Sequence, residues 1–238
     1  MDVSGLQLRL LNGFELDSAG EAVRLPMSAQ RVLAFVALQD SPLQRPYVAG
    51  SLWLDWPEQR AYANLRSALW RIHRCGLPLV NAVGQQLSLD RGVVVDVREL
   101  EALARRALAG TPTAILEPEW SLFSGDLLPD WYDDWLVLER ERYRQLRLRA
   151  LDALCARLTD AGRFDDALAA GLAAVAGEPL RESAHRAVIR VHLSEGNVGE
   201  AIRQCCLFRR LLREQLGIEP SARMDELMAG LDIQETVR

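Results

Sequence analysis

The chain has 238 residues, with 33 acidic and 28 basic side chains and a formal net charge of −5. Its hydrophobic content of 49% is sufficient for a sizeable core, and its length allows two domains. The longest apolar run, Val32–Leu38, is far shorter than the roughly 18 residues of a membrane helix, and MDVSGLQLRL lacks the pattern of a signal peptide. We therefore expect a cytoplasmic protein with no membrane partner.

The four cysteines indicate neither a disulfide framework nor a metal site. They form no CxxC pair and have no histidine nearby at metal-ligating spacing. We expect structural or incidental thiols, and we predict no metal ion and no cofactor. The cysteines are Cys75, Cys155, Cys205 and Cys206.

The first segments predict a small antiparallel sheet. Apolar residues alternate at Leu6–Leu11, Phe14–Leu16 and Ala22–Leu25, as in strands that bury one face. The pair Asn12-Gly13 is typical of a hairpin turn between the first two strands.

Three helices and a hairpin follow the predicted sheet. Apolar residues at helical spacing after a Ser N-cap predict a helix over Ser28–Gln39. A short second helix is predicted over Tyr47–Trp53, and a longer third helix over Pro57–Cys75. A hairpin turning at Gly84 comes next, and then the short extended piece Gly92–Val97. Strands, three helices and a hairpin, in that order, match a winged helix, which we place at residues 1–95.

The remainder, residues 96–238, predicts helices only. Asp96–Glu99 is typical of a capping box at a helix start, and a long helix is predicted over about Asp130–Ala161. AGRFDDAL recurs as EGNVGEAI, with Gly162 and Gly196 34 residues apart, which is the tetratricopeptide period. The predicted fold is therefore mainly α with a small β part: a winged helix followed by an all-α tetratricopeptide-like domain.

One segment has no acidic residue although the chain is acidic. From Gln59 to Leu89 there is no Asp or Glu, and the predicted helix in this segment carries an apolar stripe opposite a basic and polar face. A solvated surface helix normally balances Arg with Glu at i, i+4, so the absence of acids favours phosphates as partners. The stripe contains Ala61, Leu65, Ala68, Leu69 and Ile72; the opposite face contains Arg60, Ala63, Arg66, Ser67, Trp70, Arg71 and Arg74.

The net charge of the predicted winged-helix domain determines how strongly one copy of it can bind DNA. Nine arginines and nine acidic residues up to Asp96 make this part neutral, so the helical part carries the whole net charge. A neutral domain with one basic face neutralises few phosphates, and binding by a monomer would be weak. We therefore expect a homodimer, at least on DNA, or help from a partner protein.

Four segments of the chain match a known family in the family's order. They are LRLLNGFEL, SAQRVLAFVAL, LWLDWPEQRAYANLRSALWRIHR and FSGDLLPDWYDDWLVLERERYRQLRLRALDAL. Together they resemble the Streptomyces antibiotic regulatory protein (SARP) type of transcriptional activator, an OmpR-like winged helix followed by a bacterial transcriptional activator domain. The resemblance implies sequence-specific binding to direct repeats in double-stranded promoter DNA, and recruitment of RNA polymerase with its sigma factor. The P-loop GxxxxGK[ST] of larger relatives does not occur.

The resemblance also implies which residues meet DNA and polymerase. Tyr62–Arg74 matches the recognition helix, and Trp53–Gln59 matches the loop that often faces polymerase in this fold class. Two roles are equally open for Trp56 in that loop: an exposed aromatic anchor for a partner protein, or a buried residue. The wing tip Gly84–Gln86 carries no Arg, which disfavours minor-groove insertion, although Gln85 can still bond DNA. The predicted DNA contacts are Arg60, Asn64, Arg66, Ser67, Arg71, Arg74 and Gln85.

Three other interpretations compete with a DNA-binding activator. We expect no enzyme, because the tightest group of carboxylates lies at a helix start, where acids favour the macrodipole. A non-DNA adaptor on the tetratricopeptide-like scaffold is the main alternative. A ligand pocket in a Trp-rich link is the third, although we expect the link to bury its rings against both domains. Trp70 can stack on a sugar or a thymine methyl, but packing against the wing is its expected role. The carboxylates are Asp130, Asp133 and Asp134; the link carries Trp120, Trp131 and Trp135.

Overall fold

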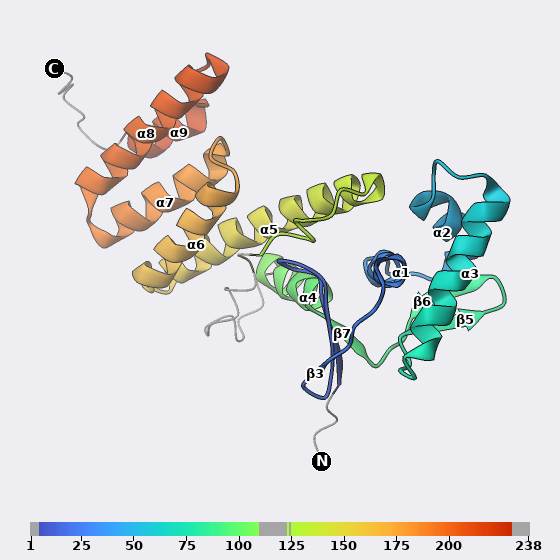
Figure 1. Ribbon diagram of the computed structural model, residues 1–238. Helices are drawn as coiled ribbons and strands as arrows, with labels where there is room; N and C mark the ends of the chain where they lie inside the picture. The colour runs from blue at the N-terminus through green and yellow to red at the C-terminus, as the bar shows by residue number, and fades with distance from the viewer. Residues whose placement is uncertain (1–4, 110–122, 124, 230–238) are drawn as a thin grey trace. The chain divides into compact units, whose positions relative to one another are not determined.

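The computed structural model describes residues 5–109, 123 and 125–229, and it has a small β part followed by helices (Figure 1). Its described residues form two compact units. The first unit comprises residues 5–103 and 125–143, and the second comprises residues 104–109, 123 and 144–229. The predicted fold class, mainly α with a small β part at the N-terminus, is confirmed.

One sheet of the first unit has four strands in the order β3-β2-β1-β7. β1, β2 and β3 pair antiparallel as predicted, and β1 buries Leu6 and Leu8 while Gln7 and Arg9 face solvent. β7 joins the other edge of β1 in parallel, a pairing that the sequence did not indicate. The strands are β1 (Leu6–Arg9), β2 (Glu15–Ser18), β3 (Glu21–Ala22) and β7 (Val93–Val95).

The second sheet of the first unit carries the predicted hairpin. Its order is β4-β6-β5, in which β5 (Val80–Val83) and β6 (Gln86–Leu89) form the hairpin and β4 (Leu43–Gln44) pairs with β6. Gly84 in the turn has φ 58°, a left-handed conformation that glycine adopts without steric strain. β4 was missed because two residues carry no periodic signal.

Helices α1 (Met27–Ala37), α2 (Arg45–Leu52) and α3 (Glu58–Arg74) follow β3 in the chain, with β4 between α1 and α2, and they pack against one another. The predicted N-cap at Ser28 is wrong. α1 begins earlier, because Pro26 has the extended backbone of an N-cap and its carbonyl accepts the first helical hydrogen bonds.

The end of α1 and the start of α4 (Asp96–Leu108) are held by side chains from α4. Arg98 donates hydrogen bonds to the carbonyls of Ala37 and Gln39 at 3.0 and 2.7 Å, which satisfies acceptors at the end of α1. The Asp96 carboxylate accepts from the backbone N–H groups of Leu10, Leu11 and Val97 at 2.7 to 3.0 Å. Burial raises the pKa of the Asp96 carboxyl, and the three backbone bonds oppose that rise.

The segment of residues 125–143 completes the core of the first unit. Trp131 stacks on Phe14 with ring centroids 6.0 Å apart, and Trp135 meets Phe35 edge-on at 5.0 Å. Leu127 forms a β-bridge with Leu11. Trp131 and Trp135 therefore pack on aromatic rings of the first unit, their burial against both domains stays a prediction, and Trp120 lies outside the described residues.

Four long helices and a short one make up most of the second unit, where α6, α7 and α8 lie side by side (Figure 1). The predicted repeat is visible in the backbone. Gly162 and Gly196 both adopt left-handed φ values, 72° and 88°, and Ala167 and Ala201 are both completely buried. The helices are α5 (Asp134–Asp160), α6 (Phe164–Gly177), α7 (Glu182–Glu195), α8 (Val198–Leu216) and α9 (Ala222–Met228). Among the described residues, no helix has the length and apolarity needed to span a bilayer.

Candidate nucleic-acid interface

The apolar stripe of α3 is buried as the sequence predicted. Each of its members is at most 5% exposed, and the helix packs against α1 and α2 through them. The stripe therefore fixes which side of α3 remains available to a partner. Its members are Ala61, Leu65, Ala68, Leu69 and Ile72.

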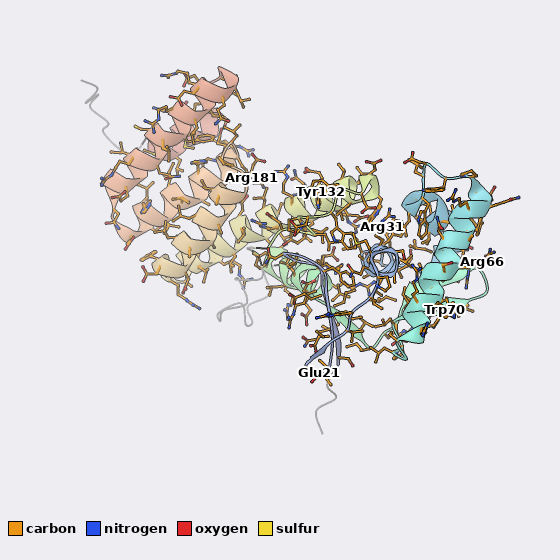
Figure 2. The ribbon with its side chains drawn as sticks, viewed as in Figure 1. Glu21, Arg31, Arg66, Trp70, Tyr132 and Arg181 are labelled. Carbon is orange, nitrogen blue, oxygen red and sulfur yellow. The ribbon has the colours of Figure 1, made fainter. Side chains whose placement is uncertain are left out.

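The opposite side of α3 is basic and polar. All four predicted arginines are exposed, as are Ser67 and Trp70, while Asn64 is half-buried at the flank. Figure 2 shows Arg66 projecting from α3 on the side away from α1. The small side chains of Ala63 and Ser67 lie between the arginines, so another molecule can approach the helix backbone closely. The arginines are Arg60, Arg66, Arg71 and Arg74.

These four guanidinium groups lie together on one side of α3, and none of them has a carboxylate partner among the described residues; Arg24 and Arg91 share that property elsewhere in the first unit, whereas three other arginines of the unit are paired. Arg9 pairs with Glu15 at 2.9 Å, Arg31 pairs with Asp133, and Arg142 pairs with Asp40 at 3.8 Å. Within residues 5–109, 123 and 125–229, none of the four forms an ion pair. The side of α3 that faces away from the core therefore presents uncompensated positive charge.

Arg71 is held by one hydrogen bond to α1. The Arg71 Nη1 donates to Ser28 Oγ at 2.7 Å, and this hydrogen bond is exposed to solvent. Ser67 is also ordered locally, since its hydroxyl donates to the Ala63 carbonyl one turn earlier at 3.0 Å. Both hydroxyl oxygens retain lone pairs that can accept a further hydrogen bond.

Two exposed tryptophans each lie under an arginine four residues later. The Arg60 Cζ lies 3.7 Å from the centroid of the Trp56 ring, and the Arg74 Cζ lies 5.1 Å from that of Trp70. Such cation–π contacts restrict the guanidinium and stabilise it by about 0.5–1 kcal/mol at an exposed site. Trp70 is 58% exposed, so its predicted packing against the wing is wrong.

The loop before α3 presents apolar side chains to solvent. Trp53 is buried, whereas Trp56 is 42% exposed and Leu54 is 74% exposed. Trp56 is therefore exposed rather than buried, and its role as an anchor for a partner protein stays a prediction. Leu54 was not singled out in the sequence. Its position directly after the predicted helix Tyr47–Trp53, in the break before Pro57, is a signal that could have indicated its exposure.

The wing tip is tied to the start of α2 through its backbone. Gln85 is exposed, and its carbonyl accepts a hydrogen bond from the Arg45 N–H at 2.8 Å. The neighbouring Val83 is 75% exposed. The tip Gly84–Gln86 therefore offers two amide side chains, Gln85 and Gln86, and no positive charge. Across the described part of the chain, no three His, Cys, Asp or Glu side chains are arranged to hold a metal ion.

Comparison with known proteins decides the family. The family model described as bacterial transcriptional activator domain matches residues 95–231, more than half of the chain. The chain belongs to the bacterial transcriptional activator domain family. The predicted SARP-type assignment is confirmed, and the family is one of transcriptional regulators.

A solved structure shares the fold. Mycobacterium tuberculosis EmbR, determined in complex with a low-affinity phosphopeptide, has a TM-score of 0.71 and 19% sequence identity to this chain. The match covers 98% of this chain and 66% of EmbR, so the chain spans slightly less than two thirds of that protein's length. No curated protein sequence shows significant similarity to the chain.

Proposed function

We propose that the chain is a sequence-specific DNA-binding transcriptional activator, and that α3 is its recognition helix. The observation that carries this proposal is the set of four exposed arginines without carboxylate partners on one side of α3. A helix in the major groove meets phosphate groups along the two edges of the groove, and guanidinium groups bind them bidentately. Membership of a family of transcriptional regulators supports the same function.

The arginines and their neighbours suit different parts of a DNA duplex. Arg66 lies near the middle of α3 between small side chains and would reach guanine edges, which present two acceptors to a guanidinium. Arg60 and Arg74, each held by a tryptophan, would meet phosphates toward the two ends of the helix. Asn64 and Ser67 would bond adenine edges or phosphates. Gln85 would reach the backbone from the wing.

The proposal assigns DNA binding and one polymerase contact to residues 1–95, and further protein binding to residues 96–238. A neutral winged helix with few phosphate contacts would need a second protomer, so we propose side-by-side binding of two copies to direct repeats. Trp56 and Leu54 on the loop before α3 would contact RNA polymerase with its sigma factor, because exposed aromatic and aliphatic side chains together suit a protein partner.

A binding experiment with a matched control tests the proposal. The wild-type chain would first select its binding sequence from a pool of random DNA duplexes, and fluorescence anisotropy would then give the affinity over a range of salt concentrations. We expect Arg66→Glu combined with Arg71→Glu to abolish binding or, where residual binding is measurable, to lower the salt slope by about 1 for each of the two residues that contacts a phosphate. Circular dichroism would show that the fold survives, since both residues are exposed.

The control is Arg210→Glu combined with Arg223→Glu, which changes the charge equally at exposed positions of the second unit. We expect this variant to bind like the wild type. Equal losses in both variants would mean that only net charge matters, and failure of the wild type to select any sequence would favour the adaptor.

A further inference from the structure

Trp70 has no role among the DNA contacts proposed above, although it belongs to the same helix. It is 58% exposed, and in α3, which the structure describes in full, it is the one large apolar side chain exposed to this degree. Arg66 and Trp70 lie about one turn apart on α3 (Figure 2). A single exposed tryptophan is not unusual on a protein surface, so its direction on the helix decides whether it can meet a partner.

Trp70 projects from the side of α3 that lies opposite the buried stripe. At about 100° per residue, Ala63, Trp70 and Arg74 fall closest to the direction that points away from the stripe. Arg66 and Arg71 fall to either side of that direction. A helix held on its domain by the stripe and laid in a major groove would therefore turn Trp70 toward the base edges on the floor of the groove.

The neighbours of Trp70 order the ring and leave part of it accessible. The Arg74 Cζ lies 5.1 Å from the ring centroid, so the guanidinium covers part of one face and restricts the motion of the indole. Ser67, three residues earlier, is small and exposed. A ring that is already ordered loses less conformational entropy when it contacts a base.

Thymine is the base whose major-groove edge best matches an indole ring. An indole offers an apolar surface with one N–H donor and no acceptor. Thymine presents its C5-methyl group beside the O4 acceptor, so both features of the indole find a partner. Cytosine presents an amino donor that an indole cannot accept, adenine pairs one acceptor with such a donor, and guanine presents two acceptors that suit an arginine better.

We propose that Trp70 is a specificity-determining residue that reads one thymine of the binding site through its 5-methyl group. This inference rests on the proposed function, because it requires α3 to lie in a major groove. The role differs from that of the arginines. Since the indole carries no charge, its removal would relax the preference for one base pair without lowering the salt slope of binding.

Replacement of thymine by deoxyuracil tests the proposal, because it removes the methyl group and retains O4 and the base pairing. The probe is the duplex that the wild-type chain selects from a random pool, with each thymine replaced in turn. We expect one replacement to weaken wild-type binding roughly fourfold, the effect of one buried methyl group, and to leave the affinity of Trp70→Ala unchanged. Failure of the wild type to select any duplex would overturn the proposed function itself, and this inference with it.

Trp56→Ala is the matched control, because it also removes an exposed tryptophan that lies under an arginine four residues later. Whatever its overall affinity, we expect this variant to retain the wild-type sensitivity to deoxyuracil. Both rings are exposed, so folding should survive, and circular dichroism checks this. The proposal would be wrong if a selected duplex contained no thymine whose replacement affects the wild type, or if every replacement affected wild type and Trp70→Ala by the same factor.

Discussion

Arg31 in α1 donates a hydrogen bond of 2.7 Å from its Nε to Oδ1 of Asp133, which lies 102 residues later in the chain. The Arg31 Nη2 also donates to the Leu52 carbonyl at the end of α2, at 2.7 Å. Both side chains of the pair are largely buried. This arginine therefore joins α1, α2 and the segment just before α5 within the first unit.

The first prediction concerns truncation of the chain. A fragment of residues 1–109 lacks Asp133 and the two tryptophan rings that pack on Phe14 and Phe35, whereas a fragment of residues 1–143 retains them. Loss of a packed Trp typically costs about 3–5 kcal/mol. We therefore expect the shorter fragment to unfold at a clearly lower denaturant concentration, as measured by chemical denaturation followed by circular dichroism.

A point substitution in the full chain separates this effect from chain length. Asp133→Ala leaves the largely buried Arg31 without its carboxylate and should destabilise the first unit by roughly 1–3 kcal/mol. Asp134→Ala removes an exposed acid from the first turn of α5 and should cost less than about 1 kcal/mol. Equal stability of the two fragments, together with equal stability of the two variants, would show that residues 125–143 are dispensable for the first unit.

The contribution of residues 125–143 could not be predicted from the sequence, because it depends on contacts between segments far apart in the chain. The same holds for β7, which pairs with β1 in parallel. Local patterns could suggest extended backbone at Val93–Val95 but not its partner. At Ser28 a local pattern was misleading. Its hydroxyl suggested a helix cap, whereas α1 begins after Pro26 and the Ser28 hydroxyl accepts a hydrogen bond from Arg71.

The predictions that held rest on periodicity. The buried stripe of α3 follows from apolar spacing alone, and the 34-residue repeat is visible because Gly162 and Gly196 must adopt left-handed backbone at equivalent positions. Exposure of Trp56 could not be decided in advance, because a loop tryptophan packs inward or outward according to its neighbours.

The second prediction uses a glycine at a helix crossing. A Cβ added at Gly171 in α6 would lie 2.8 Å from Val188 Cγ2 in α7 and 3.2 Å from Cys155 Sγ in α5. Because Val188 and Cys155 are completely buried, neither can move aside easily. We expect Gly171→Ala to destabilise the second unit by about 1–3 kcal/mol, through the mechanism of overpacking.

Gly199 in α8 is the matched control for this substitution. A Cβ there would have no neighbour closer than Arg203 Nη2 at 3.9 Å. We expect Gly199→Ala to stabilise the chain by roughly 0.5–1 kcal/mol, because alanine loses less backbone entropy in a helix. Chemical denaturation of both variants measures the difference in their free energies of unfolding. A Gly171→Ala variant as stable as Gly199→Ala would mean that the packing around Gly171 accommodates a methyl group without overpacking.

The third prediction concerns pH and the completely buried His185. The Nδ1 of His185 accepts a hydrogen bond from Gln204 Nε2 at 2.9 Å, and the Nε2 of His185 donates one to the Pro179 carbonyl at 2.9 Å. This arrangement suits the neutral imidazole ring. Its ring also packs on Phe208 with centroids 4.3 Å apart. Burial lowers the pKa of His185 below its ordinary value of 6.5, despite the opposing bond to Pro179.

The sign of the effect follows from which state binds more protons. Below about pH 6.5 the unfolded chain protonates His185 while the folded chain does not, so stability falls as the pH falls toward the lowered pKa of the folded state. The slope from this one group is at most about 1.4 kcal/mol per pH unit. Above about pH 6.5 both states are neutral, and the group contributes no pH dependence.

Chemical denaturation of the full chain between about pH 8 and pH 5 measures this slope in wild type and in His185→Gln. Glutamine does not titrate, so we expect the variant to be less stable at the upper end, through lost packing on Phe208, and to lose less stability than wild type as the pH falls. His73→Gln at the exposed end of α3 is the control and should retain the wild-type slope. If His185→Gln and wild type lose stability in parallel, the acid sensitivity of the second unit arises from other groups.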